Sequence, residues 1–243
     1  RSNTPALHSM AGWLFEQALP AIVDTTSPRA WAFSLMGIHE YLKRFSGDRR
    51  ASQVRDELAG RLLALYQSNR SDHWRWYEEG LTYCNAALPH ALFISGQEMS
   101  NESMTRAALE SLSWLADLQR ADEAGGHFVP IGSNGFYRQG GKRARFDQQP
   151  VEAQTMVSAC LEAARITGDK RWRKEARRAF EWFLGRNDLN VAIYDPMSGG
   201  CRDGLHPDRA NENQGAESTL AFLQALLELR LADNVLQPVE AHS

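Results

Sequence analysis

The sequence predicts an all-α fold, specifically an α/α toroid of about four helical hairpins that forms a small or incomplete barrel. Apolar residues recur with helical periodicity along most of the chain. One hairpin pattern occurs three times, and its short turns alternate with long loops. A chain of 243 residues can bury a sizeable core, and we expect residues 1–243 to form one domain.

Start and stop signals divide the chain into about eight helices. Thr4 and Pro5 place an N-cap residue before a proline, and Ser27 begins a second helix in the same way. The fourth helix, expected from near Gly80, must kink at Pro89 or begin late. The others are expected at about 5–19, 28–45, 50–66, 101–119, 149–166, 169–184 and 213–231.

The repeated unit is a helix, a tight glycine-containing turn and a second amphipathic helix, with Gly47, Gly96 and Gly168 in the three turns. The connections between hairpins are longer. They cover residues 20–27, 67–80, 120–149 and 185–212. Alternating helices place all short turns at one end and all long loops at the other, so the long-loop end is expected to carry the function.

Hairpins that repeat in this way form either an open solenoid or an α/α toroid, and we favour the toroid. The second, fourth, sixth and eighth helices then form the inner ring, and their N-termini face the long-loop end. The segment 121–148 contains a glycine-rich stretch that resembles a β-hairpin or a flap.

Composition excludes several classes of partner. The net charge is −3 and basic residues are dispersed, so we expect no nucleic-acid partner. Apolar runs fall short of the roughly 20 residues that a membrane span requires, so we expect no membrane association. Three widely spaced cysteines indicate reduced thiols and a bacterial-type cytoplasmic location. The chain begins without a Met or a signal-like segment, as a trimmed chain or a domain of a longer protein would.

The first candidate site is the stretch DHWRWYEEGLTYCN, residues 72–85. Its aromatic rings can stack on a sugar, and its carboxylates and amide can bind hydroxyl groups. The predicted residues are the substrate-binding Trp74, Trp76, Tyr83 and Asn85 and the catalytic Glu79. Alternatively, the tryptophans fill the core, and the glutamates complement a helix dipole.

A second cluster, RFDQQPVEAQTM at 145–156, begins the sixth helix. Asp147 and Gln149 are predicted to bind substrate, and Glu152 to be catalytic, because several amides and carboxylates at a cavity mouth suit a polyol ligand. The alternative is a capping arrangement in which Asp147 caps the helix and Glu152 lies near its third position.

The third cluster runs from Tyr194 through DPMSGGCRDGLHPDRANENQGAESTL. Its glycines indicate tight turns and close backbone approaches before the last helix. Asn213 and Glu217 share a helix face, and Gln214 lies on the adjoining stripe. We predict that Asn213 and Gln214 bind substrate, and that Asp203 and Glu217 are catalytic. Asn213 could instead be only an N-cap.

Other chemistry finds little support. Cys201 and His206 lack a second pair of metal ligands, and no phosphate loop, nucleophile elbow or dinucleotide motif occurs. We therefore expect neither a metal nor a cofactor. The basic residues Arg138, Lys142, Arg143 and Arg145 could attract an anionic substrate, although a solvated surface loop explains them better.

At these motifs the sequence resembles the six-hairpin glycosidase-like superfamily of α/α toroids. More closely, FDQQPVEAQTMVSACLEAARITGDKRW, WFLGRND, YDPMSGGCRDGLHPD and NQGAESTLAFL look like the toroid domain attached to some bacterial group 1 glycosyltransferases. The match covers about residues 70–232. The resemblance implies the fold, a carbohydrate context and a glycosyltransferase partner or fused domain, and it supplies no catalytic residue.

The leading hypothesis is a carbohydrate-active domain that binds a glycoside at the long-loop end. One version of this hypothesis adds hydrolysis of the bound glycoside. Hydrolysis requires two carboxylates, about 6.5–9.5 Å apart for inversion or about 5–5.5 Å for retention. The alternative is a non-catalytic sugar-binding or accessory module of a glycosyltransferase system. A third hypothesis, a helical scaffold for protein partners, fits less well with the long polar loops at one end.

Overall fold

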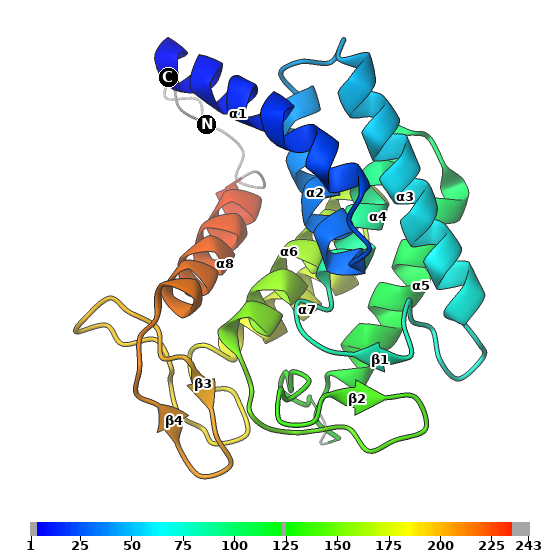
Figure 1. Cartoon of the computed structure of the whole chain (residues 1–243). Coiled ribbons are helices and arrows are strands. Elements are labelled where there is room, and N and C mark those ends of the chain that lie inside the picture. The colour runs from blue at the N-terminus through cyan, green and yellow to red at the C-terminus, as the bar shows by residue number, and fades with distance from the viewer. Residues whose placement is uncertain (1–3, 123–124, 235–243) are drawn as a thin grey trace, which may run out of the picture.

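The computed structural model describes residues 4–122 and 125–234. Eight helices and four short strands occur in these two ranges (Figure 1). The helices are α1 (Pro5–Val23), α2 (Pro28–Leu42), α3 (Arg49–Asn69), α4 (Ala87–Glu98), α5 (Glu102–Leu118), α6 (Pro150–Thr167), α7 (Lys170–Glu181) and α8 (Ala216–Asn234). The strands are β1 (Gly80–Leu81), β2 (Tyr137–Arg138), β3 (Gly204–Leu205) and β4 (Ala210–Asn211). The all-α prediction is confirmed.

The helices form two layers of an α/α toroid. In the inner layer α2 packs against α4, α4 against α6, and α6 against α8. The helices α3, α5 and α7 each pack on the inner helix that precedes them in the chain, which confirms the predicted hairpins. Figure 1 shows α8 standing apart from α1 and α2, so the layers form an arc rather than a closed ring.

Local sequence explains most helix ends. The side chain of Asp48 accepts hydrogen bonds from the amides of Arg50 and Ala51, and Ser27, Asn101 and Asp169 also cap their helices with side-chain oxygens. A proline occupies the first turn of α1, α2 and α6. Gly168 ends α6 in the left-handed conformation, with φ of 69°.

The fourth helix differs from its prediction in two respects. It begins at Ala87 rather than near Gly80, which is the late start expected as one way to accommodate Pro89, and the proline then lies in the first turn, where a missing N–H costs nothing. Gly96 lies inside α4 rather than in the turn, and a Cβ there would lie 2.7 Å from the hydroxyl of Thr105 on α5. The glycine therefore serves close packing between the two helices of this hairpin.

One strand pair joins two different loops, and the other lies within a single loop. The segment that was expected to form a β-hairpin inside 121–148 contributes β2, which pairs antiparallel with β1 from the preceding loop. The second ladder joins β3 to β4. Both ladders lie at the end of the molecule where α6 and α8 begin (Figure 1). The long loops are therefore anchored to one another at this end.

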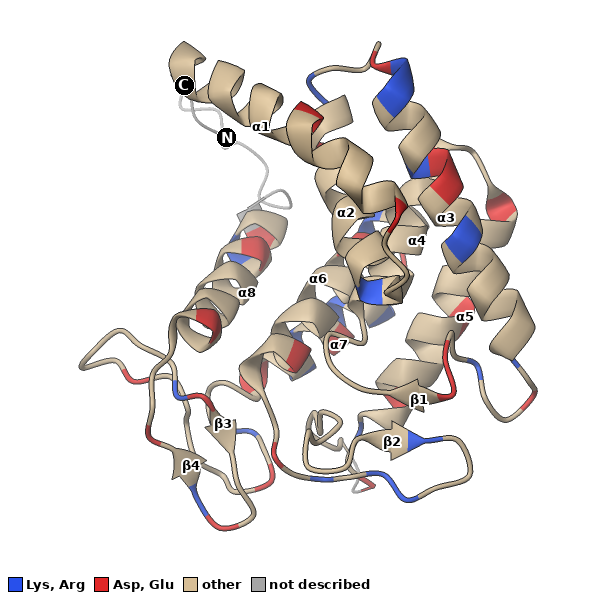
Figure 2. Ribbon diagram, in the orientation of Figure 1, with Lys and Arg blue, Asp and Glu red and all other residues tan. Residues whose placement is uncertain are grey.

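The core lies between the two layers and extends beneath the long loops. Helix α6 is buried on most of its surface. The three cysteines are buried and form no disulfide. In Figure 2, acidic and basic residues occur at intervals along α3 and along the loops. Within the described ranges, no helix combines the length and apolarity that a membrane span needs.

Candidate functional site

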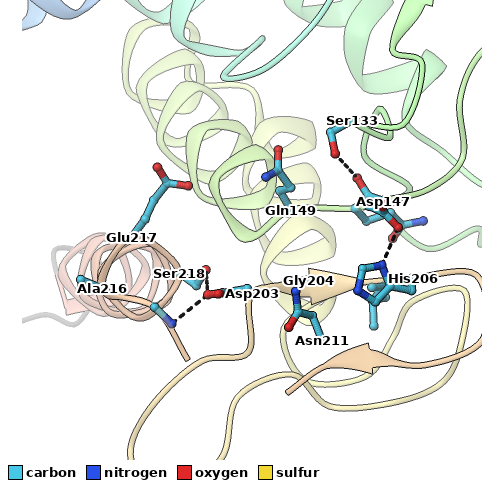
Figure 3. Close-up of a pocket in the computed structure, with 13 residues that line it drawn as sticks. Ser133, Asp147, Gln149, Asp203, Gly204, His206, Asn211, Ala216, Glu217 and Ser218 are labelled. Atoms are coloured by element: carbon cyan, nitrogen blue, oxygen red, sulfur yellow. Dashed lines mark hydrogen bonds and ion pairs between the residues drawn. The ribbon is translucent and has the colours of Figure 1, made fainter. Parts of the chain in front are cut away.

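A cavity of about 520 Å³ opens at the long-loop end (Figure 3). Three segments that are distant in the sequence enclose it, namely the loop before α6, the β3–β4 ladder and the first turn of α8. The lining residues are Ser133, Asp147, Gln148, Gln149, Asp203, Gly204, Leu205, His206, Asn211, Gly215, Ala216, Glu217 and Ser218. Most of these residues carry a hydroxyl, amide, imidazole or carboxylate group.

Backbone contacts fix the floor of the cavity. The amide of Gln148 donates to the carbonyl of Leu205 at 3.0 Å, and the reverse bond has the same length. Gly204 makes this approach possible: its φ is 146°, and a Cβ there would overlap the carbonyl oxygen of Gln148. The predicted close backbone approach in this glycine-rich segment is thus confirmed at Gly204.

The buried Gln148 side chain supports this floor from below. Its Nε2 donates to Asp188 Oδ2 at 2.7 Å, and its Oε1 accepts from Trp182 Nε1 at 2.8 Å. Asp188 also pairs with Arg145 at 2.7 Å. Arg145, considered above for an anionic substrate, therefore anchors the loop before α6 to the segment after α7.

Asp203 links the β3 segment to the start of α8. Its Oδ1 accepts hydrogen bonds from the amide of Gly215 at 2.8 Å and from the hydroxyl of Ser218 at 2.7 Å. Asp203 thereby caps the helix from a distance and is held rigidly at the cavity wall (Figure 3). A Cβ at Gly215 would lie 2.9 Å from the carboxylate, so this position requires a small residue.

His206 and Asp147 form a pair on the opposite wall. The imidazole Nδ1 lies 2.6 Å from Asp147 Oδ1, and both side chains are about one-third exposed. The backbone of Asp147 is fixed by the amide of Ser133, which donates to its carbonyl at 2.8 Å. This pair can hold a proton between the two side chains and hydrogen-bond a hydroxyl group.

Glu217 and Gln149 extend from neighbouring inner helices into the upper part of the cavity (Figure 3). Glu217 is exposed on the first turn of α8, and Gln149 is the residue that precedes α6. Of the predicted residues, the cavity therefore brings together Asp147, Gln149, Asp203 and Glu217. These four come from two clusters more than 50 residues apart.

Trp74 and Trp76 do not form an exposed platform, which corrects that prediction. They are 2% and 0% exposed and belong to the hydrophobic core. Trp74 Nε1 donates to the carbonyl of Glu78 at 2.7 Å, and both rings contact Trp114. The large apolar area of the indoles decides their placement, because burying it contributes more than a surface contact would.

Tyr83 and Glu79 are exposed but do not line this cavity. The ring of Tyr83 packs against the guanidinium of Arg29, whose Cζ lies 5.1 Å from the ring centroid. Glu79 lines a separate cavity beside β1 and β2. Neither residue therefore contributes to the lining of the main cavity.

Glu152 and Asn85 are buried rather than exposed to a substrate, and neither lines the cavity. Asn85 Nδ2 donates to Glu152 Oε2 at 2.9 Å, and Arg29 donates to Asn85 Oδ1 at 3.3 Å. Burial raises the pKa of Glu152 to about 7, opposed by the hydrogen bond from Asn85. Arg29 also pairs with Glu78 at 2.6 Å, so this network joins α2, the loop before α4, and α6.

Asn213 and Gln214 also lie outside the cavity lining. The carbonyl of Asn213 accepts the amide of Asp203 at 2.8 Å. Gln214 contacts the hydroxyl of Ser198 at 2.7 Å and the carboxylate of Asp195 at 3.2 Å, which holds the turn at 195–200. Their predicted contact with substrate is not supported.

Several residues of the cavity are not singled out by the sequence. Ser133 belongs to no motif, Asn211 and Ser218 lie in the third cluster without a predicted role, and the sequence suggests only metal binding for His206. Its partner Asp147 lies 59 residues away, and only the pairing of Gln148 with Leu205 brings them together. No group of three or more metal-ligating side chains occurs among the described residues.

Comparisons with known proteins identify similar folds. No protein-family model matches the sequence, and no curated protein matches it. Two solved structures are inactive variants of GH76A, an α-1,6-mannanase of Salegentibacter sp. HEL1_6, in complex with α-1,6-mannotetrose or α-1,6-mannotriose. Both are 13% identical with a TM-score of 0.57, and the matches cover 84% and 88% of this chain.

A third structure, the GH76A α-1,6-mannanase from the same organism, is 12% identical with a TM-score of 0.54 and covers 90% of this chain. The match with it covers 63% of that chain, and the matches with the two variants cover 55% and 62%. The present chain thus spans less than two thirds of these enzymes. It shares with them an α/α-toroid fold.

Proposed function

We propose that the cavity between the loop before α6, β3 and α8 binds a saccharide. The observation that carries this proposal is the lining, in which Asp147, Asp203, His206, Asn211 and Glu217 surround one space. Carboxylates, amides and imidazoles at several angles match the many hydroxyl groups of a sugar. The complexes of the structurally similar mannanases with mannooligosaccharides add support.

The charge of the lining favours a neutral sugar. Asp147, Asp203 and Glu217 contribute three carboxyl groups, and His206 is the one basic side chain in the described lining. An anionic sugar such as a uronic acid would be repelled by these carboxylates. Arg145 does not offset this repulsion, because it pairs with Asp188.

Hydrolysis is the second candidate function, and Asp203 and Glu217 are the two predicted catalytic carboxylates that line the cavity. Asp203 is also committed to capping α8. Binding is therefore better supported than hydrolysis, as expected of an accessory module in a glycosyltransferase system.

Isothermal titration tests binding, with α-1,6-mannooligosaccharides, other neutral oligosaccharides and uronic acids as ligands. We expect a neutral oligosaccharide to bind, and Glu217→Gln to weaken its affinity about tenfold, because a charged hydrogen-bond partner is lost. The matched control is Glu212→Gln, which alters an exposed glutamate outside the cavity lining. The proposal fails if no saccharide binds or if the two variants behave alike.

A reducing-sugar assay on the same ligands tests hydrolysis. Release by the wild type that is lost in Asp203→Asn and Glu217→Gln would establish a glycoside hydrolase. Binding without release supports the accessory module. Removal of each carboxylate in turn distinguishes catalysis by this pair from a trace contaminant, because a contaminant would be unaffected.

A further inference from the structure

A second cavity, of about 440 Å³, lies beside the β1–β2 ladder. Its lining comes from the segment that leads into α4 and from the loop before α6. The lining residues are Glu78, Glu79, Gly80, Leu81, Thr82, Gly135, Phe136, Tyr137 and Arg138. The binding cavity described above shares none of these residues.

The walls of this second cavity are well fixed. Gly80 pairs with Arg138 in the ladder, and the amide of Gln139 donates to the carbonyl of Glu79 at 2.9 Å. A Cβ at Gly80 would lie 3.2 Å from the carbonyl oxygen of Tyr137, so the two segments approach closely. The ring of Tyr137 packs edge-on against the buried Trp74 at 5.3 Å. Packing thus anchors one wall to the core.

Phe136 presents an aromatic ring at this cavity. The residue is half-buried and has a φ of 56°, in the left-handed region that bulky side chains rarely adopt. Two backbone bonds hold it there, from its amide to the carbonyl of Gly132 at 3.0 Å and from the amide of Ala144 to its carbonyl at 2.8 Å. The surrounding loop therefore imposes an unfavourable conformation that places this ring at the cavity.

The other groups in the lining suit a sugar. Glu79 and Arg138 are exposed and can exchange hydrogen bonds with hydroxyl groups. Glu78 is already paired with Arg29 at 2.6 Å, so it contributes to the wall rather than to a ligand. An aromatic ring beside free polar groups matches the apolar face and polar rim of a pyranose.

One loop connects the two cavities. Ser133 and Asp147 line the first cavity, and Gly135 to Arg138 line the second. The amide of Ser133 donates to the carbonyl of Asp147, and the amide of Asn134 donates to the carbonyl of Phe146 at 3.2 Å. These two bonds join the beginning of the loop to its end. An oligosaccharide that occupies both cavities would therefore have to lie across this loop.

We infer that the second cavity is a further saccharide subsite, so that the protein binds an oligosaccharide chain rather than a single sugar. Phe136 stacks on one sugar ring, and Glu79 and Arg138 bind its hydroxyl groups. The first cavity holds the other end of the chain. This inference rests on the proposed function of the first cavity.

Titration with one neutral oligosaccharide series, from monosaccharide to tetrasaccharide, tests the inference. We expect the affinity to rise about tenfold or more with chain length. Phe136→Ala should lower the affinity for the tetrasaccharide about fivefold to tenfold and leave the shortest ligand unaffected, because a stacked ring contributes only where a sugar reaches it. Phe136→Tyr should retain the affinity. Phe33→Ala, on exposed α2 surface, is the matched control.

Glu79→Ala is a second test of the same affinity, and it leaves the strained backbone at Phe136 unchanged. Circular dichroism checks that each variant folds. The inference is overturned if the affinity does not depend on the length of the oligosaccharide and if neither Phe136→Ala nor Glu79→Ala changes that affinity. If Glu217→Gln still weakens binding in that case, the proposed function stands. If no saccharide of any length binds, the inference and the proposed function both fail.

Discussion

At the scale of single residues, Glu152 is the most unusual group in the structure. The residue is 2% exposed, its Oε2 accepts from Asn85 Nδ2 at 2.9 Å, and the backbone amides of Cys84 and Asn85 also hydrogen-bond to the carboxylate. Burial of a charged carboxylate is unfavourable, which is why its pKa is raised to about 7 from an ordinary value of 4.5. Near neutral pH a substantial fraction of the molecules therefore carries a proton on this residue.

This raised pKa predicts that stability depends on pH. Between about 4.5 and about 7 the folded protein binds the Glu152 proton more tightly than the unfolded chain does, so the free energy of unfolding decreases as pH rises through this window. Glu152→Gln mimics the protonated form and should remove this decrease. At pH 8 the variant should be more stable than the wild type, by on the order of 2–3 kcal/mol.

Urea unfolding of both proteins at pH 5 and pH 8 measures this difference. Glu79→Gln is the matched control, because Glu79 is exposed. A wild type and a Glu152→Gln variant with parallel pH profiles would show that Glu152 is not the source of the dependence.

Burial of individual side chains explains why part of the site could not be predicted. Chemistry identifies which side chains can bind a sugar, but burial decides which ones do. Suitable sugar-binding groups occur on Trp74, Trp76, Asn85 and Glu152, but all four side chains are buried. Trp76 is fully buried, and no local pattern in the sequence separates it from an exposed aromatic.

At the scale of elements, the start of α8 depends on a residue outside the helix. Asp203 accepts from the amide of Gly215 and from the hydroxyl of Ser218, so it supplies the cap that local sequence does not. Asp203→Ala should destabilise the protein by about 1–2 kcal/mol, as loss of an N-cap does. Asp203→Asn keeps an acceptor oxygen and should cost less.

Thermal unfolding of the two variants, with the exposed Asp208→Asn as a control, tests this role. Saccharide affinity should fall in Asp203→Ala as well, because Gly215 and Ser218 line the same cavity. If Asp203→Ala matches the wild type in stability, the capping role is wrong.

Most helices could be predicted because their signals are local. Proline in the first turn, Asp or Asn at the N-cap and glycine after the last turn act within a few residues of the helix end. The strands could not be predicted, because each has two residues and its partner lies in a different loop or beyond a turn. Gly80 shows the difference: it suggested a helix start, but pairing with Arg138 makes it a strand.

At the scale of the whole molecule, the alternation of short turns and long loops determined where the site lies. The cavity is at the long-loop end, where α6 and α8 begin, as the hairpin pattern predicted (Figure 1). The particular residues that meet there depend on nonlocal pairings such as Gln148 with Leu205. The place of the cavity was therefore predictable, and only part of its lining was.

The open arc also predicts unequal local stability. Helix α6 contacts α4, α7 and α8 and is buried on most sides, whereas Leu19 is the buried residue of α1. Amide hydrogen exchange should therefore be slowest in α6 and fastest among the helices in α1, since local opening there exposes little apolar surface. Equal protection of α1 and α6 would contradict this.

The most direct test of saccharide binding at the cavity is a crystal structure of the protein with its tightest-binding neutral oligosaccharide. A sugar in contact with Asp147, His206 and Glu217 is the predicted result. A sugar bound only elsewhere on the protein, with this cavity free of ligand at saturating concentration, would contradict the proposed function.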